Sequence, residues 1–464
     1  MIFVVQPDLQ FFSVSSVLFC SISVHPDHRV RIDRATAKNR ERVQKMNRRK
    51  FIYSVGMTGM SLPFLNADSV AVAAGQSANA KSAPKAKSVI NIFLSGGLSQ
   101  YDSFNMEVDK AVIGNSKIIN SNVDGVRVSH YFPTLAKQMD KLLVINSMKS
   151  NQGAHPAGIY KMLTSYDPRS SITHPQLGAW VSKRLTTPQD SLPNFVSIGK
   201  GSAGTAGFFP GQWAALPVKN TRTGIDFVSR NAAVTEDKFT KRLGILDSLN
   251  GDFDQDYGTK DTSAYANTYK GSLKFMNSKD IDAFELENEN KHIVDLYDKQ
   301  EFSRSCMLAG RLVERGVRYV KVELGGWDYH DNLYGKLPAN AGKLDKGLSS
   351  LLTHLTEKGL LDSTLVVVST EFGRKPGVNP NKGRDHHPDG FTCLMAGAGV
   401  KAGQIYGTTT KDGESADEDV LEVTDFNATI AWRLGIDLGA EEKSPGGRPF
   451  KLADKGEARK ELFA

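Results

Sequence analysis

Short apolar segments with the character of buried strands alternate with helical segments over most of this chain, and that alternation restricts its fold more than any other feature. Five runs combine apolar and β-branched residues and are bounded by glycine or polar residues. The five are residues 88–94, 142–145, 316–324, 363–369 and 391–396. Helical patterns at 302–315 and 343–358 precede the third and fourth runs. The sequence therefore predicts an α/β fold with a central, mostly parallel sheet flanked by helices.

Side chains that can bind metal follow four of these predicted strands. Parallel strands bring their carboxyl ends to one edge of the sheet, which is where ligands bind. The candidates are Asp102 after the first strand, His155 after the second, Asp328 and His330 after the third, Glu371 after the fourth, and Asp385, His386 and His387 just beyond it. Carboxylates and imidazoles gathered in this way suit divalent cations. Two cations ~3.5–4 Å apart would hold the oxygens of a phosphate or sulfate ester.

The stretch GRDHHPDGF at 383–391 places two of the ten histidines at adjacent positions. Successive side chains on a regular strand point to opposite faces, so neighbouring histidines could not both face one point. We interpret the stretch as a loop that aims both histidines at two metals, or one at a metal and the other at the substrate. Four further histidines are interpreted as surface, turn or helix residues, namely His130, His174, His292 and His354.

The distribution of charge argues against nucleic-acid binding. The net charge is +7, but the first 87 residues carry 13 Lys and Arg against five acidic residues, so the remainder is close to neutral. A basic surface of the kind that binds nucleic acid is therefore not expected on the folded part. Cys20, Cys306 and Cys393 lie far apart in the sequence and form no paired motif, so we expect the last two to be buried free thiols.

Residues 46–74 have the layout of a twin-arginine export signal. Arg48-Arg49 precede a weakly apolar stretch, and Ala71-Val72-Ala73 offers a cleavage site. The apolar run at 51–65 contains two glycines and a proline and is shorter than the ~20 residues needed to span a bilayer. We therefore expect export to the periplasm or beyond by the twin-arginine machinery, without a permanent membrane span.

One segment precedes this signal, and a linker and a predicted catalytic domain follow it. Residues 1–45 fit no signal and are interpreted as an upstream extension from a misassigned start, with Met46 as the true one. Residues 75–87 are rich in small polar residues and are expected to be a flexible linker. Residues 88–464 form the predicted catalytic domain. Within it, 200–290 is Gly-rich at first, then polar and helical in pattern, and is interpreted as an insertion or cap.

Several of these stretches together resemble the DUF1501 family of exported bacterial proteins, within the alkaline phosphatase-like (sulfatase-like) superfamily. The similar stretches are FLSGGLSQYDSFN at 93–105, GAHPAGIYKMLTS at 153–165, the segment 306–332 with GGWDYH, the segment 369–391 and VTDFNATIAWRLGID at 423–437. The resemblance implies an alkaline phosphatase-like fold and a metal site for phosphate or sulfate esters. It also implies metal binding by Asp102. The superfamily's Asp-His pair corresponds here to Glu371-Phe372, in which Glu371 can bind metal and Phe372 cannot.

The sequence also differs from the superfamily pattern at the position of the nucleophile. Sulfatase-like enzymes begin C/S-x-P-S-R-x-x-x-L-T-G with their nucleophile, and the alignment of 153–165 with this motif puts His155 in that place and Ile159 in the place of the arginine. Because neither Cys nor Ser stands there, a formylglycine-type mechanism is not favoured. His155 could bind metal, act as a general acid or base, or form a covalent phosphoryl intermediate. Ser99 is an alternative nucleophile, and a metal-bound hydroxide would need no protein nucleophile.

These features predict an exported, metal-dependent hydrolase that acts on a small-molecule or polysaccharide ester of phosphate or sulfate. The sequence leaves the cation open among Zn, Mn, Fe, Ca and Mg. Arg374 and Arg384 are candidates for stabilising the anion, because a forked guanidinium matches oxyanions. Two alternatives stay open: a non-catalytic metal- or polysaccharide-binding protein of the same fold, and a phosphomutase or transferase.

Overall fold

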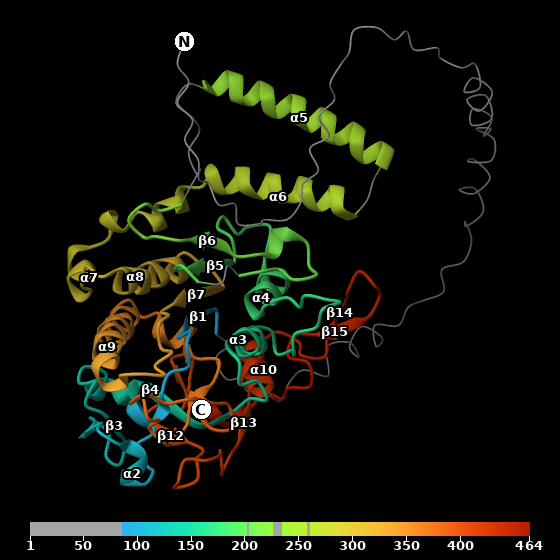
Figure 1. The fold of residues 1–464 in the computed structure, drawn as a ribbon. Coiled ribbons are helices and arrows are strands. Elements are labelled where there is room, and N and C mark those ends of the chain that lie inside the picture. Colours follow the sequence, from blue (N-terminus) through green and yellow to red (C-terminus); the bar gives the residue numbers. More distant parts are fainter. Residues whose placement is uncertain (1–85, 202–203, 226–233, 258–259) are drawn as a thin grey trace, which may run out of the picture. The chain divides into compact units, whose positions relative to one another are not determined.

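The computed structural model describes residues 86–464 except 202–203, 226–233 and 258–259 (Figure 1). The upstream extension, the twin-arginine signal and nearly all of the linker lie outside the described residues, so their interpretation stays a prediction. None of the helices in the described part is both long and apolar enough to cross a membrane.

Nine strands form one central sheet in the described part of the chain. They are β1 (Ser88–Phe93), β4 (Leu142–Lys149), β5 (Phe195–Ile198), β6 (Leu216–Val218), β7 (Tyr319–Glu323), β8 (Thr364–Ser369), β11 (Phe391–Ala396), β12 (Gln404–Tyr406) and β13 (Leu421–Glu422). Their order is β12-β4-β11-β8-β1-β7-β5-β6, with β13 also paired to β4. Only β11 runs antiparallel to its neighbours in this sheet. The predicted α/β class with a mostly parallel sheet is therefore confirmed.

Helices cover both faces of the sheet, which explains why its central strands are rich in buried apolar residues. All six residues of β1 are buried, and they alternate between two cores. Ile90 and Ile92 face α8 (Glu301–Glu314) and α9 (Leu333–Glu357), whereas Val89 and Phe93 face α3 (His155–Thr164), α4 (Leu177–Leu185) and α10 (Val423–Arg433). Figure 1 shows these two groups of helices on opposite sides of β1. Burial on both faces is typical of parallel strands.

The described residues form ten further α-helices and strands outside the central sheet and the helices named above. They are α2 (Lys110–Ile113), α5 (Glu236–Tyr257), α6 (Lys260–Met276), α7 (Lys291–Leu296), β2 (Ile118–Asn120), β3 (Arg127–Ser129), β9 (Gly373–Arg374), β10 (His386–His387), β14 (Glu441–Lys443) and β15 (Pro449–Lys451). The segment 200–290 thus supplies the edge strand β6 and two long helices. Its interpretation as an insertion or cap stays a prediction.

The two cysteines expected to be free thiols are free and buried. Cys393 lies on β11, where burial raises the pKa of its thiol to about 12. Two of the histidines interpreted as surface, turn or helix residues are buried, and one of these two lies in a helix, as that interpretation allows. His174 is enclosed by aromatic rings, and His354 lies in α9 with no exposed surface.

His354 makes stability depend on pH. Its Nδ1 lies 3.0 Å from the Tyr297 hydroxyl, and its ring packs on Gly310 of α8. Burial lowers the pKa of His354 from 6.5 to about 4, so the unfolded chain takes up the proton first as the pH falls. This group should therefore remove about 2 kcal/mol of unfolding free energy between pH 7 and pH 5. Urea unfolding of the native protein and of His354→Gln at both pH values measures it. An equal pH-dependent loss in the two proteins would contradict the prediction.

Candidate functional site

Segments that follow three strands, β4, β7 and β8, bring three histidines and an aspartate together at the carboxyl edge of the sheet. His155 begins α3 after β4, Asp328 and His330 follow β7, and His386 lies on β10 beyond β8. One ligand atom each from His155, Asp328 and His386 lies within 4.8 Å of the others. His330 Nε2 lies 2.9 Å from His386 Nε2 and 3.0 Å from Asp328 Oδ1. We name these four residues the histidine–aspartate cluster.

All three histidines of the cluster are oriented in the same way. In each, Nδ1 contacts an oxygen acceptor outside the cluster, which leaves Nε2 facing Asp328 or its neighbours. The pairs are His155 Nδ1 with Glu371 Oε1 at 2.7 Å, His330 Nδ1 with Asp385 Oδ1 at 3.0 Å, and His386 Nδ1 with the Gly153 carbonyl at 2.8 Å. An imidazole that donates from Nδ1 presents a lone pair at Nε2, which is the usual arrangement of metal-binding histidines.

Two distances within the cluster are close to those expected between ligands of one cation. His155 Nε2 lies 3.2 Å from Asp328 Oδ2, and His386 Nε2 lies 3.4 Å from Asp328 Oδ1. Tetrahedral ligands at about 2.1 Å from a metal would be about 3.4 Å apart. The His155 Nε2 atom is also buried, and its contact with Asp328 Oδ2 lacks the geometry of a hydrogen bond. Imidazole nitrogen with carboxylate oxygen is a donor set that suits Zn, Mn or Fe.

Arg374 positions Asp328 and keeps it ionised. Its Nη2 donates to Asp328 Oδ1 at 2.6 Å, while Nε donates to the Gly97 carbonyl and Nη1 to the Arg384 carbonyl, both at 2.9 Å. Partial burial alone would raise the pKa of Asp328, but Arg374 and the nearby histidines lower it to about 2. Because its donors are used in this way, we assign Arg374 to positioning. The anion-binding role predicted for it stays a prediction.

Glu371 and Asp385 contact the Nδ1 atoms of His155 and His330, on the far side of each ring from Nε2. Glu371 is fully buried, and its Oε1 also accepts the backbone N–H of Gly96 at 2.8 Å. The hydrogen bond to Glu371 raises the pKa of His155, with partial burial acting in the opposite direction. Asp385 Oδ1 also accepts from Asn379 Nδ2 at 3.2 Å. These two carboxylates orient histidines, and whether either one also binds metal directly stays a prediction.

Asp102, Ser99 and Arg384 form a separate buried group. Arg384 Nε donates to Asp102 Oδ2 at 2.8 Å, and neither side chain is exposed. Ser99 Oγ donates to the same oxygen at 2.5 Å, and Ser116 Oγ donates to Oδ1 at 2.6 Å. Both carboxylate oxygens of Asp102 are thus occupied by protein donors. The structure does not bring this group into the cluster, so the ligand, nucleophile and anion-binding roles predicted for its members gain no support from it.

His387 points away from the cluster. The expected loop is in fact the short strand β10, in which His386 pairs with Arg374 and His387 pairs with Gly373. This corrects the loop interpretation. Because successive side chains of a strand face opposite sides, His386 and His387 point in opposite directions. His387 is buried, and burial lowers its pKa. Its predicted metal role therefore has no partner among the cluster residues.

Two features of the site were missed at the sequence level. The first is the Gly153 carbonyl, because a backbone acceptor leaves no sign in residue type. The second is the position of Phe372, whose ring centroid lies 4.9 Å from that of His155 and 4.5 Å from that of His386. Phe372 forms an apolar wall against both imidazoles. Gly96 belongs to the glycine pair that follows the first strand. Its φ of +117° and its close approach to Trp327 both require glycine.

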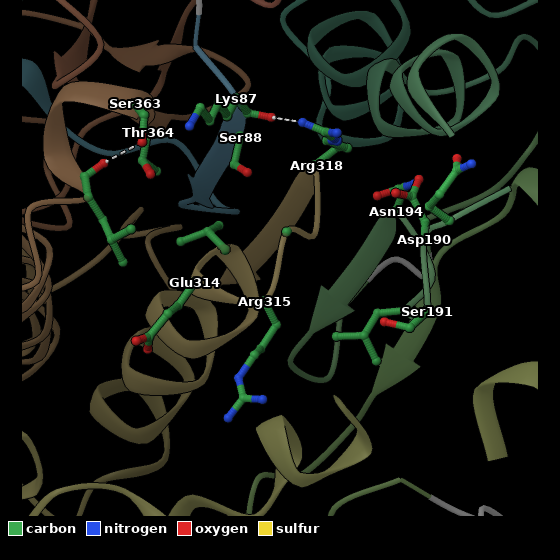
Figure 2. A pocket seen from close by; sticks show the side chains of 15 residues that line it. Lys87, Ser88, Asp190, Ser191, Asn194, Glu314, Arg315, Arg318, Ser363 and Thr364 are labelled. Atoms are coloured by element: carbon green, nitrogen blue, oxygen red, sulfur yellow. Dashed lines mark hydrogen bonds between the residues drawn. The ribbon is translucent and has the colours of Figure 1, made fainter. Parts of the chain in front are cut away.

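Another cavity, of about 340 Å³, lies at the opposite edge of the sheet. Figure 2 shows Ser88 and Thr364, the first residues of β1 and β8, beside Lys87 and Arg318. Arg318 Nη1 donates to the Lys87 carbonyl at 3.3 Å. Ligands of mostly parallel sheets bind beyond the carboxyl ends of the strands, whereas this cavity lies at the amino ends. We therefore place the candidate site at the histidine–aspartate cluster.

Comparison with protein families identifies the chain. The family model for DUF1501, described as a protein of unknown function, matches residues 86–463. The chain belongs to the DUF1501 family. The match covers every residue of the cluster, so this DUF1501 protein carries its candidate site within the family's own domain. No curated protein matches the sequence.

Solved structures with similar folds include sulfatases. The PsFucS1 sulfatase from Pseudoalteromonas sp. is 16% identical, with 87% of this chain and 77% of that chain covered and a TM-score of 0.41. Ps i-CgsB in complex with k-i-k-neocarrahexaose is 12% identical, with coverage of 76% and 72% and a TM-score of 0.38. A protein in the alkaline phosphatase superfamily from Vibrio parahaemolyticus is 10% identical, with coverage of 76% and 67% and a TM-score of 0.37.

Proposed function

We propose that this DUF1501 protein is an exported, metal-dependent hydrolase of phosphate or sulfate esters. The observation that carries the proposal is the common orientation of three histidines, whose Nδ1 atoms are held by outside acceptors while their Nε2 atoms face Asp328 or one another. At 2.9 Å, two unprotonated Nε2 atoms repel unless a cation or a proton lies near them. The export signal predicted at 46–74 supports the proposed location outside the cytoplasm.

The residues of the site have separate roles in this proposal. His155, Asp328 and His386 would hold a divalent cation, with His330 as a further ligand. Such a cation, when bound, supplies an activated water and withdraws charge from the ester oxygens. Glu371 and Asp385 keep the Nδ1 protons of two of these histidines in place, and Arg374 fixes the Asp328 carboxylate. Phe372 excludes water from one side of the imidazoles.

Metal content and turnover test the proposal together. The protein should bind at least one equivalent of one of Zn, Mn, Fe, Ca or Mg, as measured by elemental analysis. It should also hydrolyse 4-nitrophenyl phosphate or 4-nitrophenyl sulfate, lose that activity with a chelator and regain it when the metal is restored. Stoichiometric metal without turnover of either ester would favour the non-catalytic alternative. Absence of stoichiometric metal under every loading condition would overturn the proposal.

A further inference from the structure

A cavity of about 460 Å³ lies at the same edge of the sheet as the histidine–aspartate cluster. Lysines from three elements line it. Lys200 follows the carboxyl end of β5, Lys219 directly follows β6, and Lys343 lies on α9. Because their side chains converge on one concave space, their positive potentials add there and are screened less than on an open surface.

The acidic residues of this cavity already have partners. Glu323 Oε1 accepts from Ser95 Oγ at 2.9 Å, and its Oε2 lies 3.4 Å from Lys321 Nζ. Glu301 Oε1 accepts the backbone N–H of Thr221 at 2.6 Å. Both carboxylates are therefore engaged by the protein.

The three lysines have no carboxylate partner among the described residues. Lys343 Nζ donates to the neutral Asn340 Oδ1 at 2.9 Å. Among the described residues, no carboxylate lies within salt-bridge distance of Lys200 or Lys219, and both side chains are exposed. The cavity thus presents ammonium groups that are available to an anion from solution.

Neighbouring stretches of the chain contact the cavity and the cluster. Ser95 and Gly96 are consecutive, and they face different sites: the Ser95 hydroxyl donates to Glu323 at the cavity, whereas the Gly96 N–H donates to Glu371 behind His155. Gly325 lines the cavity three residues before Asp328. Three residues span at most about 11 Å, so one extended ligand can reach both places.

We propose that this lysine cavity binds a second anionic group of the ester substrate. The substrate class is then a polyanion, such as an oligosaccharide with more than one sulfate or phosphate group. This inference rests on the proposed function, because the cluster is taken to hold the ester that is cleaved. The lysines add affinity for the second anion, whereas an ester with a single anionic group gains nothing from them.

Binding of two polyanions tests the inference. The probes are a sulfated and a phosphorylated dextran tetrasaccharide, with the unmodified tetrasaccharide as the neutral reference, titrated into the metal-loaded protein by calorimetry. Lys200→Ala/Lys219→Ala should weaken binding of at least one polyanion about 10-fold, as expected for two partly exposed ion pairs. Hydrolysis of a 4-nitrophenyl ester should stay at the native level. The polyanion that responds identifies the anion as sulfate or phosphate.

Two matched variants separate charge from general effects. Lys200→Arg/Lys219→Arg keeps both charges and should retain most of the affinity. Lys401→Ala/Lys455→Ala removes two exposed lysines outside the cavity, one of them beside β12 at the other edge of the sheet, and should bind as the native protein does. Equal affinity in the Lys200/Lys219 alanine variant and the native protein for both polyanions would overturn the inference.

The inference and the proposed function fail in different ways. If the cluster holds no metal and no ester is cleaved, the proposed function fails, and the lysine cavity loses its role as a substrate subsite even if polyanions still bind there. If metal and hydrolysis are present but polyanion binding does not depend on the lysines, only the subsite is wrong.

Discussion

His386→Ala should reduce metal affinity at least about 100-fold and abolish ester hydrolysis, because even residues that merely orient a ligand contribute 10–100-fold. The neighbouring variant His387→Ala should leave both properties close to native. The two histidines are adjacent on β10, but His386 Nε2 lies 3.4 Å from Asp328 and His387 faces the buried interior. The pair therefore compares a cluster residue with a non-cluster residue at almost the same point of the backbone.

Isothermal titration with Zn or Mn and the 4-nitrophenyl ester assay measure both variants. Because His387 is buried, its replacement should lower stability by about 1 kcal/mol, and thermal melting is recorded to separate this effect from metal loss. A similar loss of metal in both variants would show that both histidines bind it, as the sequence-based prediction had it. Native metal affinity in His386→Ala would remove the histidine–aspartate cluster from the mechanism.

Much of the sheet was predictable because its central strands are buried on both faces. The predicted runs at 88–94, 363–369 and 391–396 differ from β1, β8 and β11 by one residue or less at each end. The strands β5, β6 and β12 were not predicted, since three or four residues are too short to show a pattern. The antiparallel direction of β11 is likewise set by the path of the chain through space, which no local pattern encodes.

The limits of the site prediction have a similar physical origin. The rule that strands deliver side chains to one edge brought His155, Asp328, His330 and His386 together. The same rule could not separate these residues from Asp102, which also follows a strand. The difference depends on Arg384, 282 positions away in the sequence, whose guanidinium reaches Asp102 in the buried interior. Pairing over such a distance depends on the completed tertiary structure.

The buried ion pair of Asp102 and Arg384 gives the largest effect on stability that we expect. Arg384→Met should lower the unfolding free energy by about 3–5 kcal/mol, because it leaves the fully buried Asp102 carboxylate without its counter-charge. Arg384 also donates to the carbonyls of Val112, Lys375 and Pro376, so the variant leaves further acceptors unpaired. Urea unfolding at neutral pH measures the change.

The double variant Asp102→Asn/Arg384→Met distinguishes a buried charge from lost packing. An amide needs no counter-charge, so the double variant should recover part of the loss seen in Arg384→Met. The reference is Arg127→Met, since Arg127 and Glu107 form a partly exposed pair 2.7 Å apart whose loss should cost no more than about 1 kcal/mol. If Arg384→Met costs no more than Arg127→Met, then the Asp102 carboxylate is not held by Arg384 alone. The Asp102 carboxylate would then be available for the metal-binding role that the resemblance implies, and Asp102 would have to be added to the proposed metal ligands.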